Sequence, residues 1–79
     1  MTPTVTLYTR PGCHLCDEAR ATLERLQGQA DFAIAEVDIT TDDALHRRYL
    51  ERIPVTFVDD AEHDYWRVSE DRLRAELLA

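Results

Sequence analysis

Cys13 and Cys16 are the only cysteines among the 79 residues, and they lie three positions apart. A disulfide between residues this close removes little entropy from the unfolded chain, so it is poorly suited to stabilising a fold. A thiolate can instead attack a partner's disulfide, and a second sulfur nearby can then break the mixed disulfide that forms. The spacing therefore predicts a two-step thiol–disulfide exchange in which Cys13 attacks and Cys16 resolves.

The pair lies where a strand pattern gives way to a helix pattern. Residues 4–8 are β-branched and aromatic, and after Cys13 apolar side chains recur at helical spacing as far as Gly28. A cysteine at the start of a helix faces unpaired backbone N–H groups and the positive end of the helix dipole, and both favour the thiolate. Positive charge from Arg10 or from protonated His14 would add to this effect.

The residues that separate or adjoin the two cysteines are expected to modulate the redox potential of the pair. These are Gly12, His14 and Leu15. Known members of this mechanistic class have potentials from about −270 mV to about −120 mV.

The remaining sequence predicts further strands and helices, at 32–39, 55–58 and 65–68 for strands, and after Thr40 or Thr41 and after Ser69 for helices. The charged stretch 59–63 is interpreted as a solvated polar turn. A helix between the first two strands makes them parallel, and a short connection makes the last two a hairpin. We therefore expect one α/β domain over 1–79, of order β-α-β-α-β-β-α, with helices flanking a four-stranded mixed sheet.

The net charge is −7, from 16 acidic against nine basic side chains, all of them arginine. No basic face is evident, so nucleic acid and anionic membranes are not expected partners. The first residues lack the basic segment and apolar run of a secretory signal, and no apolar stretch approaches the roughly 20 residues that span a bilayer. These features predict a cytoplasmic monomer without a bound cofactor.

Two segments resemble the glutaredoxins, in particular the small bacterial glutaredoxin-like proteins of the thioredoxin superfamily. The first is 7–16, Leu-Tyr-Thr-Arg-Pro-Gly-Cys-His-Leu-Cys, and the second is 49–58, which contains Ile-Pro-Val. The resemblance implies a thioredoxin-like fold and a thiol–disulfide oxidoreductase. It also implies a cis proline at Pro54 facing the cysteines, and a free backbone at Ile53 that pairs with the partner segment. Substrate would thus be bound by Ile53, Pro54 and Arg10.

Two departures from the family's pattern leave alternatives open. Arg67 and Val68 stand where glutathione-using glutaredoxins carry two glycines, so the reductant is either glutathione or a thioredoxin reductase. Leu7 stands where thioredoxins keep a buried carboxylate, so water or another group must accept the proton. The disulfide to be reduced belongs to a protein or to a small molecule.

Other interpretations of the same residues compete with these. A structural zinc site would need two further ligands, and His14, His46 and His63 match no common zinc spacing, so no metal is expected. The histidines at 46 and 63 are interpreted as solvated surface residues. A redox-inert module that binds a protein through its acidic surface and Trp66 is the alternative from another functional class.

The aromatic residues near the pair leave their roles open. Tyr8 either flanks the site or covers the core. Trp66 is expected to pack as a residue of the last strand, with contact to substrate as the alternative. Glu36 and Asp38 are interpreted as surface charges at a strand end.

Overall fold

The computed structural model describes residues 2–66 and 68–78. Its elements are β1 (Thr4–Thr9), α1 (His14–Gln27), β2 (Ala33–Asp38), the 3-10 helix η1 (Ile39–Thr41), α2 (Asp43–Tyr49), β3 (Val55–Val58), β4 (Ala61–Tyr65) and α3 (Glu70–Leu78). Apart from η1, this is the order expected from the sequence. The position of Arg67, which was assigned to the last strand, lies outside the described residues.

The described strands form one mixed sheet in the order β2-β1-β3-β4. β1 pairs in parallel with β2, because α1 carries the chain back between them, and it pairs antiparallel with β3. β3 and β4 form the closing hairpin. This confirms the expected α/β architecture and the parallel and antiparallel pairings.

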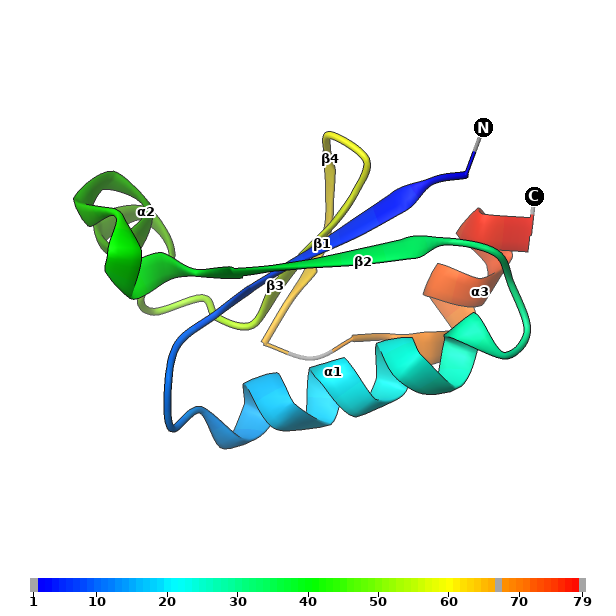
Figure 1. The fold of residues 1–79 in the computed structure, drawn as a ribbon, viewed down its shortest axis with the longest axis horizontal. Helices are drawn as coiled ribbons and strands as arrows, with labels where there is room; N and C mark the ends of the chain where they lie inside the picture. The colour runs from blue at the N-terminus through cyan, green and yellow to red at the C-terminus, as the bar shows by residue number, and fades with distance from the viewer. Residues whose placement is uncertain (1, 67, 79) are drawn as a thin grey trace.

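Helices cover the two faces of the sheet unequally. α1 and α3 lie together against one face, whereas α2 lies beyond the carboxyl ends of β1 and β2 (Figure 1). The core under α1 and α3 contains Val5, Leu7, Ala19, Leu23, Leu26, Ala30, Phe32 and Leu73. A second cluster on the α2 side includes both cysteines. The carboxyl end of β1 therefore delivers the chain to the boundary between the two clusters.

α2 begins at Asp43, later than a cap at Thr40 or Thr41 would place it. Asp38 first turns the chain into η1, since its carboxylate accepts the Thr40 N–H at 2.9 Å. Asp42 then caps α2, accepting the N–H groups of Ala44 and Leu45 at 2.8 and 3.1 Å. The prediction that Thr40 or Thr41 caps this helix is wrong because aspartates take both capping positions.

The predicted turn at 59–63 and strand at 65–68 are also wrong. The hairpin turn is only Asp59 and Asp60, and β4 runs from Ala61 to Tyr65. Asp59 adopts a φ of 54°, the left-handed conformation that two-residue hairpin loops require. Its carboxylate accepts the Thr4 N–H at 3.0 Å, which holds the turn against β1. The polar residues after the turn are tolerated because β4 is an edge strand.

His63 is not a solvated surface residue. Only 4% of its side chain is exposed, and its Nδ1 lies 2.9 Å from Glu76 Oε2 on α3. His46, in contrast, is partly exposed on α2. The prediction fails at His63 because α3 packs over β4, a contact between segments that local polarity cannot indicate.

Truncation of Leu23 should destabilise the α1 face of the core. The side chain is fully buried among residues of β1 and α3, so Leu23→Ala should lower the free energy of unfolding by about 2–5 kcal/mol. Urea denaturation measures this, with exposed Glu24→Ala as the matched control, expected within about 0.5 kcal/mol of the native protein. Equal losses in the two variants would contradict the packing described.

Candidate redox site

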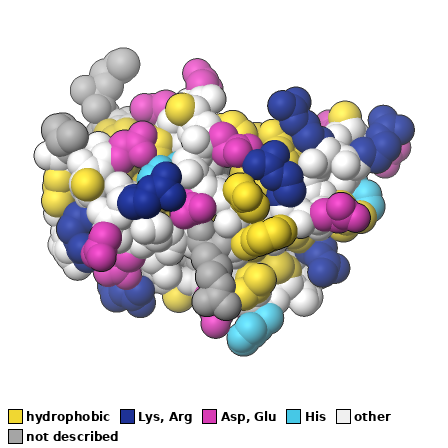
Figure 2. All heavy atoms as spheres, turned by 180° about the vertical axis from the view of Figure 1, so that it is seen from behind, with side chains coloured by type: hydrophobic (Ala, Val, Ile, Leu, Met, Phe, Trp, Pro, Cys, Tyr) yellow, Lys and Arg dark blue, Asp and Glu magenta, His cyan; other side chains and the backbone are white. Residues whose placement is uncertain are grey.

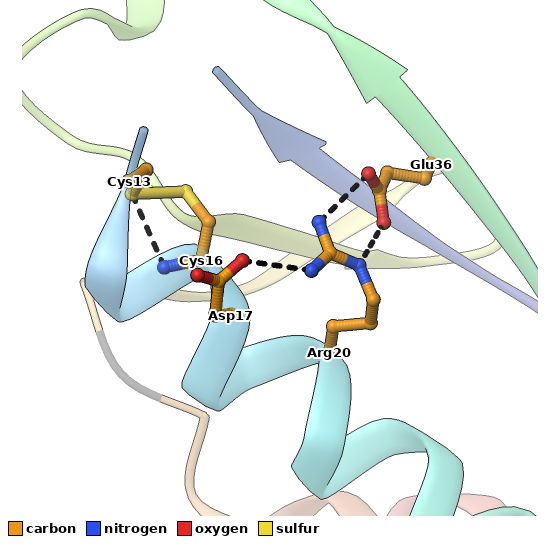
Figure 3. The surroundings of a disulfide bond; sticks show 5 residues. All are labelled: Cys13, Cys16, Asp17, Arg20 and Glu36. Atoms are coloured by element: carbon orange, nitrogen blue, oxygen red, sulfur yellow. Dashed lines mark hydrogen bonds and ion pairs between the residues drawn. A yellow bond between two sulfur atoms is a disulfide. The ribbon is translucent and has the colours of Figure 1, made fainter. Parts of the chain in front are cut away.

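Cys13 and Cys16 are joined by a disulfide at the beginning of α1, with their Cα atoms 5.2 Å apart. Cys13 is the N-cap residue, with extended backbone angles, and its Sγ accepts the Cys16 N–H at 3.1 Å (Figure 3). Such an N–H has no partner within the helix, so a side-chain acceptor satisfies it. In the reduced protein the same N–H would point at the Cys13 thiolate and stabilise its negative charge.

The two cysteine residues differ in their exposed fraction. Cys13 is 8% exposed and Cys16 only 1%. Both residues are therefore buried, and Cys13 is the more exposed of the two. This difference fits the roles predicted from the sequence, in which Cys13 attacks first.

The turn that leads from β1 into the helix depends on Gly12. This residue has a φ of 73°, a conformation that side chains other than hydrogen disfavour. Arg10 is exposed in the same connection. His14, the residue after Cys13, is also exposed, and its Nε2 lies 3.7 Å from Glu18 Oε1. Arg10 and His14 thus lie near the pair in the chain, on the solvent side.

A layer of apolar side chains supports the disulfide from beneath. Both cysteines pack in one cluster with Ile39, Tyr49, Ile53 and Val55, and Tyr8, Leu15, Leu45 and Phe57 pack against it. Tyr8 stacks on Tyr49, with ring centroids 4.9 Å apart, and meets Phe57 edge to face at 5.5 Å. Tyr8 is thus partly buried against the cluster that contains both cysteines, so the two roles left open for it, beside the site and over the core, do not exclude each other.

The loop before β3 brings Ile53 to the cysteines. The Ile53–Pro54 peptide bond is cis, as the resemblance implied, and both residues are buried. Ile53 packs in the cluster that contains the disulfide. Its backbone N–H already donates to the Tyr49 carbonyl at 3.0 Å. The expectation of a free backbone at Ile53 is therefore wrong for this N–H.

Trp66 holds the loop before β3 in place through hydrogen bonds. This role was not predicted from the sequence. Its backbone N–H donates to the carbonyls of Arg52 and Pro54, at 3.2 and 2.8 Å, and its indole Nε1 donates to the Glu51 carbonyl at 2.8 Å. The residue has a φ of 64° and is 53% exposed, so it is not a strand residue packed in the core. The only sequence signal was a single tryptophan next to the place of the missing glycines.

An ion-pair network joins the first turns of α1 to β2. The Arg20 guanidinium donates to both carboxylate oxygens of Glu36, at 2.5 and 2.9 Å, and to Asp17 at 2.9 Å (Figure 3). The hydrogen bond from Arg20 holds the pKa of the Glu36 carboxyl below its usual value. Glu36 is thus a surface charge, as expected, but it lies within β2 and forms a bidentate pair that joins the strand to the helix bearing the cysteines.

Within the described ranges, no three side chains of the His, Cys, Asp and Glu types gather closely enough to hold a metal ion. No helix in the same ranges is long and apolar enough to cross a membrane.

Loss of Glu36 should show as a pH-dependent loss of stability. Because the folded pKa of this carboxyl is lowered, its contribution is present above the ordinary value of 4.5 and disappears as the pH falls through the folded value. Glu36→Gln should therefore cost up to about 1 kcal/mol at neutral pH, since the pair is partly exposed. Urea unfolding of both proteins across acidic pH measures this. A difference that grows on acidification would contradict the assignment.

Comparison with protein families gives an extensive match. The sequence model described as "Glutaredoxin-like domain (DUF836)" matches residues 4–78. Uncharacterized proteins of Mycobacterium tuberculosis and Mycobacterium bovis are 35% identical to the chain over 80 residues, covering 95% of this chain and 82% of each relative.

Comparison with solved structures agrees. Protein Ne2328 from Nitrosomonas europaea superposes with a TM-score of 0.86 at 33% identity, covering 98% of this chain and 93% of the other. Protein XcR50 from X. campestris gives 0.77 at 37% identity, covering 92% and 93%. A thioredoxin from Halobacterium salinarum, 24% identical, gives 0.65 over 95% of this chain and 71% of the other, and shows the fold alone. The chain belongs to the glutaredoxin-like family and has the thioredoxin-like fold.

Proposed function

We propose that this protein is a thiol–disulfide oxidoreductase that reduces disulfides of protein or small-molecule partners. The observation that carries the proposal is the Cys16 N–H directed at Cys13 Sγ at the beginning of α1. A thiolate in that position is stabilised without a neighbouring base. The family's fold and the disulfide between Cys13 and Cys16 are both compatible with this chemistry.

The proposed cycle has two exchanges. The Cys13 thiolate attacks one sulfur of the partner's disulfide, forms a mixed disulfide and expels the other partner sulfur as a thiolate, which takes a proton from water. Cys16, deprotonated, then attacks Cys13 Sγ, forms the intramolecular disulfide and expels the second partner thiolate. Two electrons have passed to the partner, and an external dithiol or two thiols must return them.

The site residues take separate roles in this proposal. Ile53 and Pro54 form the edge against which the partner segment docks, and the exposed guanidinium of Arg10 contributes positive charge near the thiolate. Because the Ile53 N–H is already bonded to Tyr49, docking would use the Ile53 carbonyl or displace that bond. The reducing chemistry fits the cytoplasmic location expected from the sequence.

The amino terminus of α3 favours thioredoxin reductase over glutathione as the electron donor. There the Ser69 N–H, which would suit an anionic ligand, donates to the Asp64 carboxylate at 3.1 Å. Glu70 adds a second carboxylate in the first turn, held by Arg25 and Arg74. The Asp64 carboxylate therefore occupies a backbone donor that the carboxylate at the γ-glutamyl end of glutathione would otherwise use.

Substitution of the cysteines should separate the two exchanges. Cys13→Ser should reduce a small disulfide no faster than the background, because the attacking sulfur is gone. Cys16→Ser should form the mixed disulfide but not release it, so the adduct should accumulate and be visible by mass spectrometry. Activity retained by Cys13→Ser would refute the proposed role and leave the redox-inert binding module.

Coupled assays should identify the donor. With NADPH consumption as the readout, thioredoxin reductase should support reduction of a small disulfide, whereas glutathione with glutathione reductase should support little. Asp64→Asn removes one internal carboxylate and should raise the weak glutathione-dependent rate. Faster turnover with glutathione in the native protein would contradict the assignment.

A further inference from the structure

A groove on the surface begins at Leu15, in the first turn of α1. It lies between the outer side of α1 and the segment that joins β4 to α3, and its volume is about 390 Å³. Leu15, Ala21 and Thr22 line it from α1, and Trp66 and Val68 line it from the other side. We refer to it as the α1 groove.

The position of the α1 groove connects it to the redox pair. Leu15 lies between the two cysteines in the chain, and Trp66 is bonded to the loop that contacts them. Ala21 follows Cys13 by eight residues, or about 12 Å along a helix. About four residues of extended chain cover that length. A peptide joined to Cys13 through its own cysteine can therefore reach the groove.

The chemistry of the α1 groove fits an apolar side chain. Trp66 is 53% exposed, although proteins bury most of the surface of tryptophan. Three hydrogen bonds hold this residue in a left-handed conformation that is strained for tryptophan. Such strain persists where surrounding contacts impose it, and it is concentrated at functional sites. Figure 2 shows hydrophobic side chains exposed among charged groups on the face turned away in Figure 1.

The charges along the α1 groove differ at its two ends. Arg25 lies at the end far from the cysteines, where Glu70 already pairs with it at 2.5 Å. Glu18 lies near the cysteines with 59% of its side chain exposed. The chain as a whole carries a charge of −7. His14 Nε2 lies 3.7 Å from Glu18 Oε1 and neutralises it only when the imidazole is protonated. With a neutral imidazole, the groove is therefore complementary to a segment with a basic residue close to its cysteine.

We propose that the α1 groove receives an extended segment of a protein partner, the one whose disulfide Cys13 attacks, with an apolar side chain of that segment held against Trp66. The inference rests on the proposed function and narrows its substrate class to protein disulfides. A basic side chain of the segment pairs with Glu18. Small-molecule disulfides would react at Cys13 without using the groove.

Two synthetic peptides test this in the Cys16→Ser variant. Each carries a lysine next to a cysteine activated as its mixed disulfide with 2-thiopyridine, and a leucine or a serine three residues further on. The Cys13 thiolate attacks the peptide sulfur, and the release of thiopyridone gives the rate. The leucine peptide should react about tenfold faster at low concentration, because one apolar side chain is buried.

Trp66 supplies an independent readout, because it is the only tryptophan in the chain. Attachment of the leucine peptide should move its fluorescence to shorter wavelength, and attachment of the serine peptide should not. Dimerisation of the free protein with the same fluorescence shift, seen by light scattering, would assign the groove to a second copy and overturn the proposal.

Substitutions on α1 complete the test. Ala21→Tyr fills the groove and should bring the ratio of the two peptide rates close to one. Glu24→Tyr adds the same side chain at an exposed position of α1 that does not line the groove, and should leave the ratio unchanged. Equal rates for the two peptides with the parent variant, or equal ratios in both tyrosine variants, would overturn the inference.

The proposed function and the inference on the α1 groove can be overturned separately. If a small disulfide such as dithiodipyridine does not react at Cys13, the proposed function fails and the inference fails with it. If the small disulfide reacts normally while the leucine and serine peptides do not differ, the inference alone is overturned.

Discussion

The hydrogen bond from the Cys16 N–H to Cys13 Sγ is the interaction on which the proposed chemistry depends. It exists because Cys13 is the N-cap of α1, where backbone N–H groups have no partner within the helix. The position of α1 is in turn fixed by the buried core beneath it and by the Arg20–Glu36 pair that joins it to β2. The fold thus holds the amino terminus of α1 beneath the Cys13 sulfur.

A second constraint acts on the other side of the sulfur pair. The loop that carries Ile53 and Pro54 packs against the cysteines, and Trp66 binds three carbonyls of that loop from the end of the hairpin. The same tryptophan is 53% exposed and lines the α1 groove. The residue that stabilises the proposed docking edge is therefore also the residue that the proposed partner segment would contact.

Sequence predicted those features that depend on neighbouring residues. The spacing of Cys13 and Cys16 between a strand pattern and a helix pattern was sufficient to place the pair, and the family resemblance gave the cis bond at Pro54. One error was local, since Asp42 rather than a threonine caps α2. The others came from contacts between distant segments. Asp59 completes a tight turn by bonding to Thr4, and His63 is covered by α3. Local polarity predicts exposure, which is right for Asp59 and wrong for His63, and it contains no information on either partner.

Alkylation of the reduced protein at mildly acidic pH tests the central claim most directly. An ordinary cysteine, with a pKa of about 8.5, is almost wholly protonated there and reacts slowly with iodoacetamide. If the terminus of α1 stabilises the thiolate, Cys13 should react many times faster than free cysteine, and mass spectrometry should locate the label on Cys13 rather than Cys16. A rate no greater than that of free cysteine, rising only near the ordinary pKa, would contradict the account.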